Sequence, residues 1–467
     1  MSLKKFQRGV LAVTAITAFL TTFSSSSMEL SIPHMEREFG VNAALIGWVL
    51  SAYILTTAAM SVPFGKVADV KGRRKVLLLG MGGFAVSSVV CALAVSFPML
   101  MAGRVLQGIF ASMIFATNNA ILISVFPRSR RGRVLGISIS FTYIGLSAGP
   151  VIGGFLNHYV GWRSIFVIAA ILGVTALLLG IAHTPKLRVE EARKKPDIAG
   201  NILFIGAIVV ALYGLTNLTV IDFGWLILVC GLALGVLFVL TEMRADDPVV
   251  RISMFTKSRV FTFSNLAALL NYGATYAISY LMSIYLQVVQ GFDSQVAGLI
   301  MVCMPGVQAV FTPLMGRLSD RVSPHKLSSG GMAVCVLSLI GMSTIGIHTK
   351  IPFIMCLLAC AGFSFALFSS PNTNAILSSV GKEDYASANA ILATMRTAGQ
   401  STSMAVVTII VGIFLGSTAL EQARPQDLVS TMRCAFIVFV ILCAAGIYLS
   451  LKRNKVSGNA GNFEKKS

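Results

Sequence analysis

Long apolar runs dominate this chain, and each is close to the length that an α-helix needs to cross a membrane. A hydrocarbon core of roughly 30 Å takes about 20 helical residues to cross. Fourteen runs of about that length fall at about 9–32, 43–64, 76–96, 98–126, 134–157, 163–182, 198–217, 223–242, 261–289, 295–316, 327–347, 351–370, 386–416 and 431–451. We therefore expect fourteen transmembrane helices, an even number that returns the C-terminus to the side where the N-terminus lies.

Charged residues make up only 12% of the 467 residues, which is half of the roughly 25% typical of soluble domains. So few charges do not cover the water-facing surface of a chain of this size, which excludes a soluble multidomain protein. The first apolar run follows basic residues, as in a signal peptide. It is longer than the roughly 7–15-residue core of a signal peptide, and no A-x-A cleavage site follows it. We expect it to be retained as the first span.

The net charge of +19 is concentrated on one side of the predicted membrane. All but seven of the 37 lysines and arginines lie in the terminal segments and loops of that side. Such an excess of basic residues is typical of cytoplasmic loops, so we expect cytoplasmic termini and a location in the cell membrane. Anionic lipid accounts for the basic charge, and nucleic acid is not an expected partner.

The residue types of metal and catalytic sites occur without the spacing that such sites need. The eight cysteines and five histidines show no metal-ligand or C-x-x-C pattern, so we expect neither a metal nor a cofactor. Residues 145–149 match the G-x-S-x-G pattern of hydrolases, but that pattern requires a strand-turn-helix context and a nearby histidine. Here it lies inside an apolar run, and we do not expect an enzyme.

A basic loop with one acidic residue follows the second apolar run, and a weaker copy follows the tenth. The two copies are offset by 251 residues. Repeated loops at corresponding places of two halves are typical of internally duplicated transporters, although a short cytoplasmic turn is the simpler alternative. We expect Asp69 to bind a basic group or a helix N-terminus and hold the cytoplasmic end closed. The first loop contains Gly65, Asp69, Gly72, Arg73 and Arg74, and the second contains Gly316, Asp320 and Arg321.

The fifth apolar run contains glycines at every fourth position. Gly145, Gly149 and Gly153 share one helix face that a neighbouring helix can approach closely. Pro150 removes a backbone donor and bends the helix, and Gly154 follows one turn later. The spacing favours close helix packing and a gating role equally.

These motifs resemble those of the major facilitator superfamily. The first basic loop is similar to motif A, the segment 104–108 with Arg104 and Gln107 is similar to motif B, and the glycine-rich fifth run is similar to the antiporter motif C. Together with fourteen runs and the segment 395–399, they resemble the fourteen-span drug:proton antiporters over about residues 9–450.

The resemblance implies an all-α integral membrane protein with the major facilitator fold. An N-terminal six-helix half is expected at 1–195, two extra transmembrane helices at 196–245, and a C-terminal six-helix half with a short basic tail at 246–467. The implied function is proton-coupled export of lipophilic or cationic compounds by alternating access, by a monomer. Its partners are the lipid bilayer, a small-molecule substrate and protons. The alternatives are uptake or facilitated transport of a small metabolite, and a non-transporting membrane sensor.

Charges inside the membrane are the best indicator of function, because a charged side chain is costly there. Glu29, Arg104 and Arg396 are the candidates. At 1.5 Å of rise per residue, Glu29 lies about 6 Å and Arg104 about 9 Å from the outer ends of their spans. The implied fold places both spans in one half, so we expect a proton-sensitive pair of Glu29 and Arg104. An interfacial Glu29 is the alternative.

The ninth run contains a row of aromatic side chains. Tyr272, Tyr276 and Tyr280 step by four residues and share one helix face. Such a face suits lipophilic or cationic ligands, and the alternative is a packing stripe or interfacial belt. The residues expected to line the substrate cavity are Gln107, Asn118, Asn271, Tyr272, Tyr276, Tyr280 and Arg396.

Overall fold

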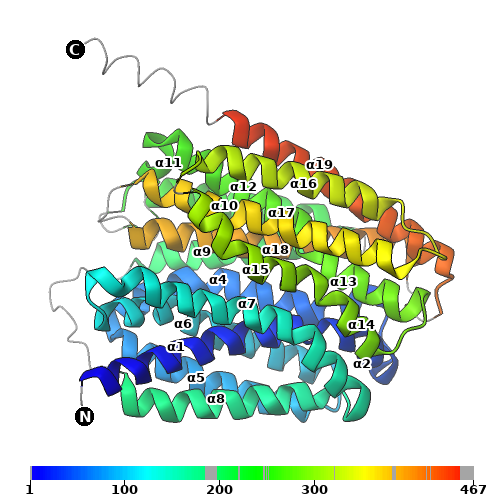
Figure 1. Ribbon diagram of the computed structural model, residues 1–467, viewed down its shortest axis with the longest axis horizontal. Coiled ribbons are helices and arrows are strands. Elements are labelled where there is room, and N and C mark those ends of the chain that lie inside the picture. Colours follow the sequence, from blue (N-terminus) through cyan, green and yellow to red (C-terminus); the bar gives the residue numbers. More distant parts are fainter. Residues whose placement is uncertain are drawn as a thin grey trace.

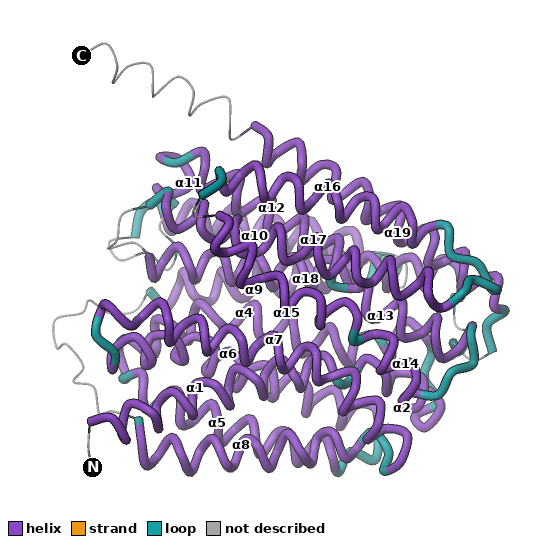
Figure 2. The backbone as a smooth tube through the Cα atoms, in the orientation of Figure 1, coloured by secondary structure: helices purple, strands orange, loops and turns teal. Residues whose placement is uncertain are grey.

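The computed structural model describes residues 3–184, 197–218, 221–245, 248, 250, 252–319, 321–380, 385–416, 418–420 and 422–452. Within these residues the regular secondary structure is entirely helical, and most of the long helices run along one direction (Figures 1 and 2). The fold is therefore an all-helical bundle, as the apolar runs predict.

Helices from the two ends of the chain occupy opposite sides of the bundle in Figure 1. The N-terminal half consists of α1 (Leu3–Ser26), the 3-10 turn η1 (Glu29–Ser31), α2 (Ile32–Phe39), α3 (Ala43–Ile46), α4 (Trp48–Lys71), α5 (Arg73–Ala92), α6 (Phe97–Val125), α7 (Arg128–Tyr159) and α8 (Arg163–His183). The C-terminal half consists of α11 (Ser253–Lys257), α12 (Arg259–Thr275), α13 (Ala277–Ile284), the π-helical turn η2 (Tyr285–Val289), α14 (Ser294–Met301), α15 (Cys303–Ser319), α16 (Pro324–Ser343), α17 (Ile351–Ser378), α18 (Tyr385–Leu415) and α19 (Pro425–Lys452). The residue boundaries of the predicted domains are not tested by this arrangement and stay a prediction.

Two further helices, α9 (Ile198–Thr216) and α10 (Gly224–Glu242), connect the halves. They pack against each other, and α9 also packs on α4 of the N-terminal half and α18 of the C-terminal half. Trp48 of α4 contacts Tyr213 of α9 with ring centres 5.7 Å apart. Large apolar side chains of α10, including Trp225 and Val236, remain exposed, as expected for a helix in contact with lipid.

Twelve segments of the described residues are long and apolar enough to cross a membrane. They match twelve of the fourteen predicted runs, so the predicted count is two higher than the structure supports by length and apolarity. The two other runs fall on α7 and on the segment from α12 to η2. In the latter, the helix is interrupted at Tyr276, which leaves 17 residues in α12 and 8 in α13. The chain is a multi-pass membrane protein.

Within the part of the chain that the structure describes, the helix is interrupted in the first, ninth and tenth spans. The first passes from α1 through η1 to α2, and the tenth changes from α14 to α15 at Val302. The ninth breaks at Tyr276, where the N–H of Ala277 donates a 3.1 Å hydrogen bond to Oγ of Ser403 on α18. Broken helices at corresponding positions of two halves are typical of transporter binding sites, because they free backbone groups and redirect side chains.

One end of the bundle holds α2 and α14 and is opposite to the start of α1 (Figure 1). We call it the distal end. Asn42 and Asp293 begin helices there, since each side chain accepts a 2.8 Å hydrogen bond from a backbone N–H three residues later. Such caps fix the start of α3, before the second span, and the start of α14, at the beginning of the tenth span.

Candidate functional site

Arg104 lies on α6 inside the N-terminal half and has no exposed surface. Its Nε donates a 2.8 Å hydrogen bond to the Val49 carbonyl of α4, and its Nη1 donates one of 2.6 Å to Oε1 of Gln107. Gln107 in turn donates to Oγ of Ser88 on α5 at 2.8 Å. The guanidinium carbon lies 4.5 Å from the centre of the Tyr53 ring. These contacts hold Arg104 against α4 and α5 and compensate in part for burying its charge.

Glu29 lies in η1, and only 5% of its surface is exposed. Its backbone carbonyl accepts a 2.8 Å hydrogen bond from Ser283 of α13. Among the described residues its carboxylate forms no ion pair or hydrogen bond, so the predicted direct pair of Glu29 and Arg104 does not form. The sequence predicts similar depths for the two residues, but Arg104 turns toward α4 and α5, a direction that depth does not determine. A coupling role for either residue stays a prediction.

Tyr276 connects the two halves in the middle of the bundle. Its hydroxyl lies 3.1 Å from Oγ of Ser25 on α1, and it lies within electrostatic reach of Glu29, Arg104 and Tyr53. We call these five residues the Glu29 cluster. The break between α12 and α13 therefore faces the break between α1 and α2, with a buried carboxylate beside it.

A second group of polar and aromatic side chains surrounds Arg396 of α18. Its guanidinium carbon lies 5.3 Å from the centre of the Tyr272 ring on α12. The Tyr272 hydroxyl lies 3.4 Å from Oγ of Ser369 on α17. Tyr143 of α7 lies against Ser369 and within electrostatic reach of Tyr272 and Arg396. We call these four residues the Arg396 cluster; it brings both halves together around one cation.

The remaining residues predicted for the cavity take part in helix packing. Asn118 donates to the Thr14 carbonyl at 3.1 Å and accepts from Thr17 at 3.0 Å, which joins α6 to α1. Asn271 is 1% exposed, and Tyr280 is 2% exposed. Of the predicted cavity residues, the structure therefore brings Tyr272 and Arg396 together and places Tyr276 at the junction of the halves.

The glycine face of α7 lies against α1, as its spacing predicts. A Cβ atom at Gly145, Gly149 or Gly153 would collide with the stretch of α1 and its end from Phe19 to Ser27. Gly154 lies against Ser294 of α14, whose Oγ donates a 3.1 Å hydrogen bond to the Gly154 carbonyl.

Helix α14 makes the matching approach from the C-terminal half. A Cβ at Gly298 would collide with the carbonyl of Pro150, so both helices rely on glycine where they cross. The predicted motif C thus packs against α1 of its own half and, near the distal end, against α14 of the other half.

Of the two glycines in the first basic loop, only one lies at the turn between the helices. Gly65 lies inside α4, whereas Gly72 adopts φ +97° between α4 and α5, a conformation that favours glycine. Arg73 begins α5, and Arg74 donates hydrogen bonds to the Ile181 carbonyl at 2.9 Å and to Thr184 at 3.1 Å. Arg74 therefore satisfies one carbonyl in the last turn of α8 and the Thr184 hydroxyl just after it.

The aspartates of both loops lie beyond what the structure describes. The side chain of Asp69 and the whole of Asp320 fall outside the described residues, so the predicted latch at Asp69 stays a prediction. In the second copy, Gly316 packs against Ser370 of α17 and Arg321 is exposed.

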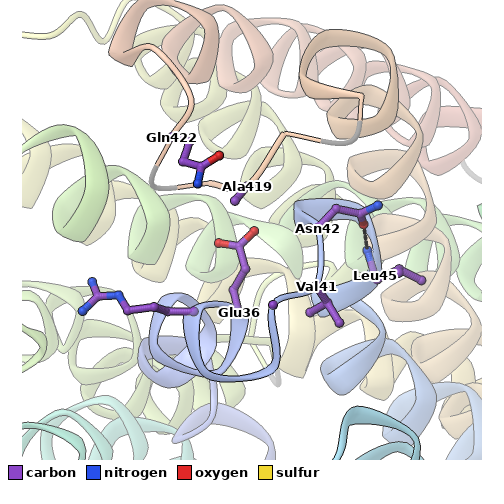
Figure 3. Close-up of a pocket in the computed structure, with 8 residues that line it drawn as sticks. Glu36, Val41, Asn42, Leu45, Ala419 and Gln422 are labelled. Carbon is purple, nitrogen blue, oxygen red and sulfur yellow. Dashed lines mark hydrogen bonds between the residues drawn. The ribbon is translucent and has the colours of Figure 1, made fainter.

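The apolar runs place Glu36 in a loop, but in the structure it is a buried carboxylate at the distal end. Glu36 lies on α2 and is 2% exposed. Its Oε1 accepts a 2.9 Å hydrogen bond from the backbone N–H of Leu420, in the loop between α18 and α19. Figure 3 shows the carboxylate pointing toward the segment that carries Ala419 and Gln422, across a pocket of about 570 Å³. No motif indicates this contact, because it joins the ends of the chain.

A helical membrane bundle with repeated loops, broken spans and buried charges at the breaks has the features of a secondary transporter. Comparison with known proteins agrees. The chain belongs to the Major Facilitator Superfamily, whose model matches residues 14–403 and 264–466. It is a transporter of that superfamily.

The relatives differ in what they carry. The chain is 29% identical over 389 residues to the riboflavin transporter RibZ of Clostridioides difficile, which covers 83% of this chain and 84% of that protein. It is 27% identical over 426 residues to the multidrug resistance protein Stp of Mycobacterium tuberculosis, at 89% and 78% coverage. Among solved structures, a bacterial homolog of the human lysosomal transporter Spinster matches with a TM-score of 0.73 and 16% identity, over 97% of this chain and 98% of that one.

Proposed function

We propose that the chain exports lipophilic compounds in exchange for protons, as a monomer of the fourteen-span drug:proton antiporter branch. The observation that carries the proposal is Glu29, a buried carboxylate without an ion pair among the described residues, at the break of the first span beside Tyr276. A carboxylate that alternates between a dry site and a hydrated one changes its affinity for a proton. Such a change couples proton movement to the motion of the halves.

The contacts between the halves support an alternating-access cycle. Glu36 with Leu420, Gly154 with Ser294, and the Glu29 carbonyl with Ser283 all join the two halves. These hydrogen bonds gather in the middle and at the distal end of the bundle. We propose that they close the distal end in this conformation and break when it opens.

We further propose that α7 and the segment from α12 to η2 also cross the membrane, which brings the spans to fourteen. The termini then lie in the cytoplasm of a cell whose plasma membrane holds the protein, and the distal end faces outward. A reporter at Arg193 should be cytoplasmic and one at Arg424 external. If both reporters are found on the same side of the membrane, this topology is wrong.

Inverted membrane vesicles test the transport function. Accumulation of a compound panel is measured with an imposed pH gradient, without it, and with a protonophore. We expect accumulation that requires the gradient and is absent from vesicles that lack the protein. Equal accumulation without a gradient would contradict proton coupling and favour facilitated transport. Gradient-driven movement in the opposite direction would favour uptake, the alternative that the likeness to a riboflavin transporter keeps open.

A further inference from the structure

We propose that the substrate site binds planar aromatic compounds that carry an anionic group, and that the guanidinium of Arg396 binds that group beside the ring of Tyr272. The proposal rests on the proposed transport function and adds the substrate class. It departs from the expectation of cationic compounds that the resemblance implied.

The charge balance in the middle of the bundle is the first reason. Two guanidinium groups, Arg104 and Arg396, lie well inside helices of the bundle, and Glu29 is the carboxylate within electrostatic reach of Tyr276. Among the described residues, no carboxylate lies within ion-pair distance of either arginine. A cationic ligand would add to an excess of positive charge, whereas an anionic ligand would offset it.

The two arginines differ in whether a ligand can reach them. Arg104 is fully buried, and its Nε and Nη1 are used by Val49 and Gln107. Arg396 is half-buried, and the described residues accept no hydrogen bond from it. Arg396 therefore has free donors for a ligand, and its planar fork suits a carboxylate or another oxyanion that accepts two parallel hydrogen bonds.

The position of Arg396 is set by the backbone rather than by a flexible loop. Three residues after it, Gly399 lies so close to α12 that a Cβ atom there would be 2.5 Å from the Leu269 carbonyl and 3.0 Å from Cβ of Tyr272. This close crossing of α18 and α12 holds the guanidinium over the Tyr272 ring. A rigidly placed guanidinium binds an anion at a smaller loss of side-chain entropy.

Aromatic rings around the guanidinium indicate the shape of the ligand. Tyr272 packs edge-to-face on Phe365 with ring centres 5.1 Å apart, and Tyr143 approaches from the opposite half. Tyr143 and Tyr276 stay partly accessible although they lie between helices. Flat apolar surfaces with hydroxyl groups at their edges favour planar aromatic ligands that also accept hydrogen bonds.

The electrostatic neighbourhoods of the two clusters are separate. Glu29, Arg104 and Tyr53 act on Tyr276, whereas Arg396 and Tyr272 act on Tyr143. The proposed anion site therefore shares no residue with the Glu29 cluster.

Binding of three ring-matched fluorescent probes to the purified full-length protein tests the proposal without any gradient. The probes are 1-pyrenecarboxylate, its neutral amide and 1-pyrenemethylammonium, followed by fluorescence anisotropy in nanodiscs of uncharged lipid. We expect the carboxylate to bind about tenfold more tightly than the amide, and the ammonium to bind more weakly still. Arg396→Gln should remove this preference and leave binding of the amide unchanged.

Two further variants keep the test decisive. Arg396→Lys, which keeps the charge without the fork, should retain part of the preference even if Arg396→Gln does not fold. Arg433→Gln alters an exposed arginine of α19 and should change nothing. A carboxylate that binds no better than the amide or the ammonium overturns the proposal. Gradient-driven export of neutral or cationic compounds would in that case leave the proposed function intact.

Discussion

The hydroxyl groups of Ser25 and Tyr276 lie 3.1 Å apart, and the two residues are separated by 251 positions. The same offset relates the two basic loops, from Gly65 to Gly316. Ser25 and Tyr276 therefore occupy equivalent positions of the two halves and touch where the halves meet. Each also lies close to a break in its span, before η1 and at the end of α12.

Removing the Tyr276 hydroxyl should weaken the contact between the two halves while the aromatic ring of Tyr276 stays in place. Tyr276→Phe loses the hydrogen bond to Ser25, which is worth about 0.5–1.5 kcal/mol. We expect gradient-driven transport to change by about two- to tenfold, with thermal stability close to that of the unmodified protein. Tyr213→Phe, on the exposed face of α9, is the matched control. An unchanged transport rate in Tyr276→Phe would show that the hydroxyl pair is incidental.

Neutralising Glu29 should separate proton coupling from substrate movement. Glu29→Gln keeps the size of the side chain but can no longer bind and release a proton. We expect gradient-driven accumulation to fall to the level of empty vesicles, while exchange of labelled for unlabelled substrate continues, because exchange needs no net proton movement.

The control is Glu38→Gln, which removes the exposed ion pair with Arg163 and should leave coupling intact. Gradient-driven accumulation that survives in Glu29→Gln would exclude Glu29 as the coupling group.

The contact between α7 and α1 should be intolerant of a single methyl group. In Gly153→Ala the new Cβ would lie 2.6 Å from the Ser27 carbonyl, which is backbone and does not move aside easily. We expect a loss of about 1–3 kcal/mol in stability and reduced transport.

Gly306→Ala is the matched control, since nothing lies within 4 Å of the added Cβ in α15. There the substitution should be neutral or slightly stabilising. Thermal unfolding of both variants in detergent measures the difference, and equal melting temperatures would contradict the close packing.

The contact of Glu36 with Leu420 should hold the distal end closed. Glu36→Ala leaves the Leu420 N–H without its acceptor, at a cost of about 1–3 kcal/mol to the closed state. We expect a cysteine introduced at Val41, which lines the pocket in Figure 3, to react several-fold faster with a membrane-impermeant thiol reagent. The same labelling rate with and without Glu36→Ala would show that this bond does not control opening.

Much of the fold follows from local features of the sequence. The spans follow from runs of apolar residues, because a helix in lipid must satisfy its backbone groups internally and cover itself with apolar side chains. The glycine face of α7 follows from four-residue spacing, and the repeat follows from comparing two loops. The resemblance to the major facilitator superfamily rests on these motifs, and the family match agrees with it.

The partners of the buried charges were decided only by the tertiary structure. Sequence placed Glu29 and Arg104 at one depth, but the direction of each side chain around its helix depends on how that helix is rotated against its neighbours. Arg104 therefore pairs with Val49 and Gln107 instead of Glu29. The break at Tyr276 likewise depends on Ser403 of another helix, 126 residues after Ala277, whose N–H it accepts.

Contacts between distant segments carry no signal in the pattern of either segment alone. Glu36 follows a span boundary and looks solvated, yet it is buried by a loop 384 residues later. Arg396 and Tyr272 lie on different spans, and only the close crossing at Gly399 brings them together. Hydropathy and spacing determine which residues enter the membrane; the rotation and crossing of packed helices determine which of them meet.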